Sequence, residues 1–285
     1  MPKRAYSILR PPELTSSVVF ASPHSGDDYP EHFLKRSLLD SQTIRSSEDA
    51  FVDKLFESAP QFGAPLLKAG APRAFIDLNR GAEELDPALI DGVRRRGHNP
   101  RVASGLGVIP RVVSNGRVIY RGKLPMHEAQ ARIASYWQPY HRMLQELLNE
   151  ARRAFGEAIL IDCHSMPHEA LDNLAKTGRR PVIVLGDRFG SSADSEIVDE
   201  IEAAFASAGL IVARNTPFAG AYVTQHYGRP SKRQNAVQIE IDRKLYMDER
   251  TITPHSDFDA FRELMEGIIA EIAAIGRPRK QLAAE

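Results

Sequence analysis

The sequence predicts an α/β fold: one domain over residues 1–285, with a core from about 17 to 275, built on a central mixed, largely parallel sheet flanked by helices. Short, apolar, β-branched segments alternate with longer segments in which apolar residues recur every three or four positions. No internal repeat interrupts this alternation. Hydrophobic residues make up 42% and charged residues 26%, which excludes a collagen-like or wholly disordered chain.

The predicted strands are short and apolar. The first covers residues 17–22 (SVVFAS) and stops at Pro23, and residues 158–163 (AILIDC) form a second of the same kind. Further strands are expected at 65–69, 73–78, 181–185, 210–213 and 237–241. The Asn115-Gly116 pair between apolar residues predicts a hairpin.

The predicted helices occupy residues 31–39, 47–59, 125–155, 194–208 and 258–275. In the longest, Pro139 must kink or split the helix, because proline lacks the backbone N–H. Residues 81–116 are rich in glycine, proline and charge and include the run Arg94–Arg96. A long irregular segment of this kind is typical of a lid or binding loop.

Composition restricts the class of protein. Lysine plus arginine and aspartate plus glutamate both total 37, so no basic excess favours nucleic acid or an anionic membrane as partner. Cys163 is the single cysteine, which excludes an intrachain disulfide and a four-cysteine zinc site. No apolar stretch approaches a membrane span, and no apolar core follows the basic N-terminus as in a secretory signal. A cytoplasmic protein that acts on a small molecule is therefore expected, and its oligomeric state is left open.

Two histidines occupy the positions where α/β proteins bind ligands. His24, in PHSG, and His164, in DCHS, each follow a predicted buried strand. A catalytic zinc takes three protein ligands and keeps a position for water, and two histidines with one carboxylate are a common set. Asp27 and Asp49 are both candidates for the carboxylate, and spacing favours Asp27 because it lies three residues after His24. The alternatives are hydrogen-bonded structural histidines, a solvated turn for Asp27 and a helix N-terminal carboxylate for Asp49.

Glu240 stands between Ile239 and Ile241 in a strand that otherwise reads as buried. An ionised carboxylate in a core strand is costly unless it is paired or faces a cleft. Beside a metal ion, it could act as the general base that deprotonates water and later protonates a leaving nitrogen. The alternatives are an ion pair with Arg243 and an edge strand with one wet face.

Asn79 and Arg80 close another predicted strand, in the sequence DLNR. The planar guanidinium of arginine suits a carboxylate, and the asparagine could add a donor. The alternative is a surface arginine paired with Glu83 or Glu84. His127, His168 and His226 are weaker candidates for catalysis, and Cys163, inside an apolar strand, is expected to be inert.

The motifs of serine hydrolases, P-loop nucleotide hydrolases and Rossmann enzymes are missing from the sequence. Instead, an ordered set of segments from residue 23 to 249 resembles the N-formylglutamate amidohydrolase family. The matching segments are PHSG, SEDAFVDKLF, FIDLNR, IYRGKLP, IDCHSMP, FAGAYVTQHYG and QIEIDRKLYMDE. Single segments are weak signals, but the ordered set is specific.

The resemblance implies a zinc-dependent hydrolase whose core is similar to that of the zinc carboxypeptidases. The implied reaction is hydrolysis of the formamide C–N bond of an N-formyl amino acid, with one zinc per chain. The family pattern has an acid at the position of Asp49, so the resemblance favours Asp49 over Asp27 as third ligand. The implied roles are metal binding by His24, Asp49 and His164, substrate carboxylate binding by Asn79 and Arg80, and general base catalysis by Glu240.

An acidic substrate side chain would require a further cation, and Arg111, Arg121 and Arg229 are open candidates. Two other readings remain. One is a metallohydrolase of another N-acyl amino acid or a small peptide, and the other is a non-catalytic protein that binds an acidic metabolite. The hydrolytic reading requires His24 and His164 to converge in the fold.

Overall fold

The computed structural model describes residues 2–94, 99–172 and 180–278. Arg95 and Arg96 of the predicted arginine run lie outside these ranges. Within them, no helix combines the length and apolar character needed to cross a membrane.

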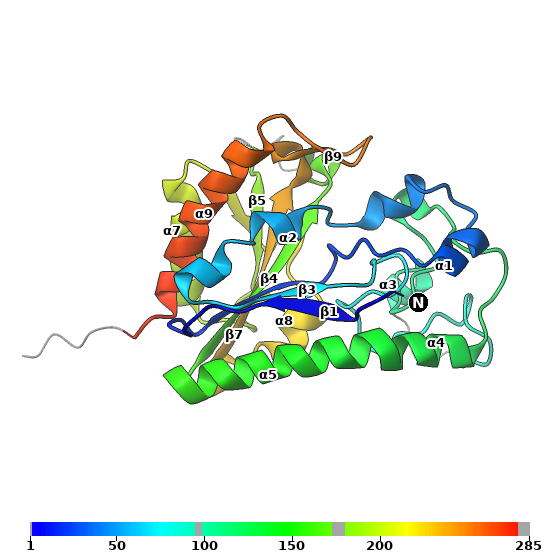
Figure 1. The fold of residues 1–285 in the computed structure, drawn as a ribbon, viewed down its shortest axis with the longest axis horizontal. Helices are drawn as coiled ribbons and strands as arrows, with labels where there is room; N and C mark the ends of the chain where they lie inside the picture. Colours follow the sequence, from blue (N-terminus) through cyan, green and yellow to red (C-terminus); the bar gives the residue numbers. More distant parts are fainter. Residues whose placement is uncertain (1, 95–98, 173–179, 279–285) are drawn as a thin grey trace, which may run out of the picture.

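A seven-stranded sheet with the strand order β1-β3-β2-β4-β7-β5-β6 forms the centre of the molecule (Figure 1). Its strands are β1 (Tyr6–Leu9), β2 (Val18–Ser22), β3 (Leu66–Ala69), β4 (Ala158–Met166), β5 (Ile183–Gly186), β6 (Val212–Arg214) and β7 (Gln234–Asp242). β1 is antiparallel to β3 and β5 is antiparallel to β7, whereas the other neighbours are parallel. The predicted mixed, largely parallel sheet is confirmed.

The structure differs from the strand predictions in several places. β1 was not predicted, and residues 73–78 form turns instead of a strand. Their apolar side chains are buried, but burial alone does not distinguish a strand from a packed turn. β4 extends to Met166, so His164 lies inside the strand and not after it.

The helices are α1 (Glu31–Arg36), α2 (Val52–Leu55), α3 (Pro100–Ala103), α4 (Met126–Arg132), α5 (Gln138–Phe155), α7 (Ser195–Ser207), α8 (Tyr222–Tyr227) and α9 (Phe258–Ile275). A small hairpin pairs β8 (Met247–Asp248) with β9 (Thr253–Pro254). The predicted helix at 47–59 is wrong: it shrinks to α2 and flanking short turns. Phe51 has a φ of 65°, in the left-handed region, and a right-handed helix cannot continue through such a residue.

The predicted interruption of the long helix is present. A π-helical segment, Ile133–Trp137, separates α4 from α5, and Pro139 lies in the first turn of α5. A wider turn directly before a proline fits the loss of that residue's N–H, which cannot bond to the previous turn. In Figure 1 the combined helix runs along one side of the molecule.

Each face of the sheet covers its own hydrophobic core. α2, α7 and α9 pack on one face, against alternate residues such as Phe20, Ile161 and Ile239. α5 and α8 pack on the other face, against Val19 and Leu160. Because side chains alternate along a strand, the residues of the second face continue to Asp162, His164, Gln238 and Glu240. This face therefore becomes polar towards the carboxyl ends of β4 and β7.

Candidate active site

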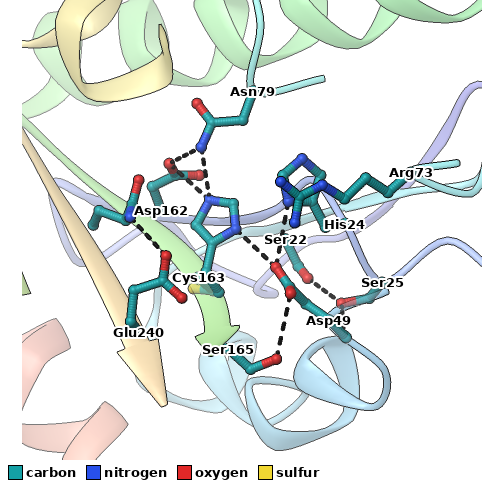
Figure 2. Close-up of polar contacts among 12 residues, drawn as sticks. Ser22, His24, Ser25, Asp49, Arg73, Asn79, Asp162, Cys163, Ser165 and Glu240 are labelled. Carbon is teal, nitrogen blue, oxygen red and sulfur yellow. Dashed lines mark hydrogen bonds and ion pairs between the residues drawn. The ribbon is translucent and has the colours of Figure 1, made fainter. Parts of the chain in front are cut away.

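His24 and His164 converge on one carboxylate, that of Asp49 (Figure 2). His164 Nδ1 lies 2.8 Å from Asp49 Oδ2, and His24 Nδ1 lies 3.3 Å from the same oxygen. The ring centroids of the two histidines are 4.8 Å apart. All three side chains are buried, and their potential ligand atoms lie within 4.8 Å of one another.

The outer nitrogen of each histidine faces a second carboxylate. His24 Nε2 lies 2.7 Å from Asp77 Oδ1, and His164 Nε2 lies 3.0 Å from Asp162 Oδ2. A carboxylate on the outer nitrogen fixes the ring orientation and keeps a proton on that nitrogen. In the neutral ring, each Nδ1 then carries a lone pair that faces the Asp49 side and is available to a metal ion. Carboxylate-backed histidines of this kind are typical of metal centres.

These residues fit a divalent metal ion. His24 Nδ1 is buried and has no hydrogen-bond partner within the part of the chain that the structure describes. Two imidazole nitrogens and one carboxylate oxygen form a donor set that suits zinc and leaves room for water. Asp27, the alternative third ligand, is exposed and does not belong to this group.

Asp49 is held in place by Arg243. Arg243 Nη2 donates to Asp49 Oδ1 at 3.0 Å and to the Glu48 carbonyl at 2.6 Å, while its Nε donates to Ser165 Oγ at 3.1 Å. Arg243 therefore occupies one oxygen of Asp49 and leaves the other for the histidines. It forms no ion pair with Glu240 within 4.0 Å, the alternative considered for that glutamate.

Neighbouring groups of opposite charge shift the pKa values of the buried Asp49 and His164. Burial by itself would raise the pKa of Asp49, but the hydrogen bond from His164 and the positive charges of His164 and His24 hold that pKa well below its usual range. Burial would lower the pKa of His164, yet Asp162 and Asp49 raise it well above its usual value. The site without metal thus favours an ionised aspartate and a protonated His164.

Gly26, the glycine of PHSG, lies where the backbone around Ala71 comes very close. A Cβ atom on Gly26 would lie 2.2 Å from the carbonyl oxygen of Ala71, so no other residue fits without a shift of the backbone. The bond from Asp49 N–H to the His24 carbonyl, at 3.1 Å, joins the segment after β2 to the segment that carries Asp49. The turn at Phe51 then leads the chain into α2.

Glu240 lies on β7 beside His164 of β4, as parallel partners in the register. Its side chain is buried, and Gln238 Nε2 donates to its Oε1 at 2.8 Å. Burial raises the pKa of Glu240 to about 7, with the charge of Asp49 adding to the rise and that of His164 opposing it. A carboxyl group with this pKa can both accept and return a proton near neutral pH.

Asn79 is fully engaged inside the protein. Its Oδ1 accepts from the Val223 N–H at the start of α8, at 2.8 Å, and its Nδ2 lies 3.3 Å from Asp162 Oδ2 and 3.0 Å from His164 Nε2. Asn79 therefore contacts both His164 and Asp162, the carboxylate that orients His164. Its predicted contact with a substrate carboxylate stays a prediction.

Arg80 is buried, which rules out a surface ion pair with Glu83 or Glu84. Its Nε donates to the Leu106 carbonyl at 3.0 Å and its Nη1 to the Asn79 carbonyl at 2.7 Å. Across the described ranges, no carboxylate lies within 4.0 Å of this guanidinium. Burial lowers the pKa of Arg80. The charges of Asp77 and Glu84 act on Arg80 from a greater distance and oppose this shift. A buried guanidinium that makes no direct ion pair can still bind an anion.

Sequence reasoning missed Arg73. Its Nε donates to Asp77 Oδ2 at 3.2 Å. Burial would lower the pKa of Arg73, but the charge of Asp77, followed by that of Asp49, raises it. Arg73 and His24 contact the two oxygens of the same carboxylate, since His24 Nε2 lies 2.7 Å from Asp77 Oδ1. The supporting roles of Asp77 and Asp162 were missed as well, although Asp162 shares a strand face with His164 and could have been found from that spacing.

None of the three arginines proposed to bind a substrate side chain has a contact that marks it for that role. Arg111 pairs with Asp86 at 2.7 Å, Arg229 donates to the carbonyls of Gln225 and Gly228, and Arg121 is exposed. The structure therefore selects none of them.

The fold and the polar cluster together define an α/β protein with a candidate metal-dependent hydrolytic centre. The sequence profile of the N-formylglutamate amidohydrolase family matches residues 16–247, and the chain belongs to this family.

Relatives of known structure and name agree with this placement. The chain is 31% identical over 251 residues to an N-formylglutamate deformylase of Pseudomonas aeruginosa, which covers 85% of this chain and 87% of that protein. It is 28% identical over 239 residues to one from Pseudomonas putida, over 81% and 82% of the two chains. The crystal structure of N-formylglutamate amidohydrolase from Ralstonia eutropha JMP134 superimposes with a TM-score of 0.88 at 34% identity, covering 95% of this chain and 98% of that one.

Proposed function

We propose that this protein hydrolyses N-formyl-L-glutamate to formate and L-glutamate, with a zinc ion held by His24, Asp49 and His164 and with Glu240 as general base. The observation that supports the proposal most is the buried pair of histidines, each backed by a carboxylate and each directed at Asp49. The names of the two Pseudomonas relatives support the choice of substrate.

The zinc ion, when bound, supplies a Lewis acid and lowers the pKa of a coordinated water towards neutrality. Glu240 accepts the proton of the attacking water and later gives it to the leaving nitrogen. Its Oε1 is occupied by Gln238, so Oε2 is the oxygen suited to this transfer. With a pKa of about 7, Glu240 serves in both directions near neutral pH.

Arg80 binds the α-carboxylate of the substrate and so fixes the formamide bond near the metal ligands. Arg73 shares the Asp77 carboxylate with His24, and its positive charge stabilises the negative charge that develops on the formyl oxygen. Both cations are positioned before the substrate binds, which is the condition for electrostatic stabilisation of the transition state.

A substrate series on zinc-loaded protein tests the proposal. We expect release of formate from N-formyl-L-glutamate, at least tenfold less activity on N-acetyl-L-glutamate, and about one zinc per chain by elemental analysis. Preference for an acetyl or peptidyl substrate would assign the protein to another class of metallohydrolase. Absence of both zinc and hydrolysis would leave a binding protein.

A charge-matched pair of variants tests Arg80. We expect Arg80→Ala to weaken activity on the free acid at least tenfold more than on its α-carboxamide, because only the acid loses an ion pair. Arg101 is an exposed arginine whose charge reaches Arg80, so Arg101→Ala serves as the control with little effect. Equal losses on both substrates would make Arg80 a structural residue.

A further inference from the structure

The backbone of Arg80 is held by the one tryptophan of the chain. Trp137 Nε1 donates to the Arg80 carbonyl at 2.8 Å, from the end of the π-helical segment between α4 and α5. Residues 70–80 include neither helix nor strand, so bonds from outside fix the path of this segment. The direction of the Arg80 side chain depends on this peptide group.

His141 holds the same segment two residues earlier. His141 Nε2 lies 2.9 Å from the Leu78 carbonyl, and its Nδ1 lies 2.9 Å from the hydroxyl of Tyr227 on α8. A carbonyl can only accept, so Nε2 must carry the proton, and in the neutral ring Nδ1 is an acceptor for the Tyr227 hydroxyl. The same hydroxyl also lies 3.2 Å from the backbone carbonyl oxygen of His141, as a second acceptor. Burial lowers the pKa of His141 to about 3, which keeps this ring neutral and its donor fixed.

The two donors form one unit. Trp137 and His141 are four residues apart, and their ring centroids lie 4.1 Å from each other. Residues at this spacing occupy one face of a helix. One helix face thus hydrogen-bonds to the carbonyls on both sides of Asn79, whose side chain α8 holds through the Val223 N–H.

We propose that Trp137 and His141 are positioning residues for substrate carboxylate binding, which fix Arg80 through the backbone carbonyls of residues 78 and 80. This inference rests on the proposed function, because it assigns the carboxylate to Arg80. Neither residue touches the reacting atoms. Their loss should therefore weaken the binding of a carboxylate more than the chemical step.

The test compares Trp137→Phe and His141→Leu, which remove the donors, with His141→Gln, which keeps an N–H donor. Tyr140→Phe is the matched control, because Tyr140 is buried on the same helix and its hydroxyl has no hydrogen-bond partner in the part of the chain described. KM and kcat are measured for N-formyl-L-glutamate and for its α-carboxamide, on zinc-loaded protein with its zinc content and melting temperature recorded.

We expect Trp137→Phe and His141→Leu to raise KM for the acid by roughly three- to tenfold, the effect of one hydrogen bond, while kcat stays within about twofold. KM for the carboxamide should stay unchanged. His141→Gln and Tyr140→Phe should behave as the unmodified enzyme does.

Two results overturn the inference. One is a Trp137→Phe variant whose KM for the acid equals that of Tyr140→Phe. The other is an equal loss on both substrates with a lower kcat, which marks a general structural role. If His141→Leu does not fold, the inference is still tested by the KM of Trp137→Phe and by whether His141→Gln keeps the unmodified kinetics. If the unmodified enzyme has the same KM and kcat for the acid and the carboxamide, the proposed role of Arg80 is wrong, and this inference fails with it.

Discussion

Replacing Glu240 by glutamine separates its chemical role from its structural one. Glutamine has nearly the same shape and keeps an oxygen for the bond from Gln238, but it cannot accept a proton at neutral pH. We expect turnover to fall by at least about a hundredfold, the usual contribution of a general base. Bound zinc should be retained, because Glu240 is outside the group of three potential ligands.

The raised pKa of Glu240 gives a second, independent magnitude in the metal-free protein. The carboxyl titrates at about 7 in the folded chain against an ordinary value of 4.5. Between these values the folded state keeps a proton that the unfolded state has lost, so the free energy of unfolding falls as the pH rises. At about 1.4 kcal/mol per pKa unit, roughly 2.5 kcal/mol is lost from this group between pH 5 and pH 8.

Urea unfolding of chelator-treated protein at pH 5 and pH 8 measures this loss. The unmodified protein should lose about 2.5 kcal/mol more over this interval than Glu240→Gln does. Glu263→Gln, an exposed glutamate on α9, is the control and should follow the unmodified protein. The same pH dependence in Glu240→Gln would refute the buried, proton-holding carboxyl, and near-normal turnover would refute the general base.

Three further predictions concern metal binding. Asp49→Ala should abolish stoichiometric zinc binding in elemental analysis, whereas Asp27→Ala should leave it intact; the reverse would make Asp27 the ligand. Arg243→Met should weaken zinc affinity by about 10- to 100-fold in a chelator competition, because Asp49 loses its support; unchanged affinity would argue that this bond is dispensable. Zinc affinity should rise with pH through neutrality, because the raised pKa of His164 keeps a proton on the ring that the ion must displace; a flat profile would contradict this.

Local sequence patterns were sufficient for most elements of the sheet. β2, β3, β5 and α9 lie where apolar runs and helical periodicity place them, because these signals depend on neighbouring residues. The helix at 47–59 could not be foreseen in its true form. Its interruption occurs at the left-handed backbone of Phe51, just after Asp49 bonds to the His24 carbonyl, and no local pattern in the sequence signals that conformation.

Some residues of the candidate site could likewise be predicted from the sequence, and others could not. His24 and His164 could be singled out from the sequence because each follows a predicted buried strand, and Glu240 because it interrupts an apolar one. Spacing favoured Asp27 as their partner, and the family resemblance favoured Asp49; in the structure Asp49 lies beside both histidines. Distance along the chain says little here, since His164 and Asp49 are 115 residues apart and form a hydrogen bond.

By itself, the sequence determined the α/β class, the family and the residue types available for catalysis, since these depend on local pattern and on motif order. Only the tertiary structure decided which groups surround the histidines: Asp77 and Asp162 behind them, Arg243 on Asp49, and the helix face of Trp137 and His141 behind Arg80. The physical reason is that a buried polar atom takes its partner from whatever the packing of distant segments brings within 3 Å or so, and no local pattern encodes that distance.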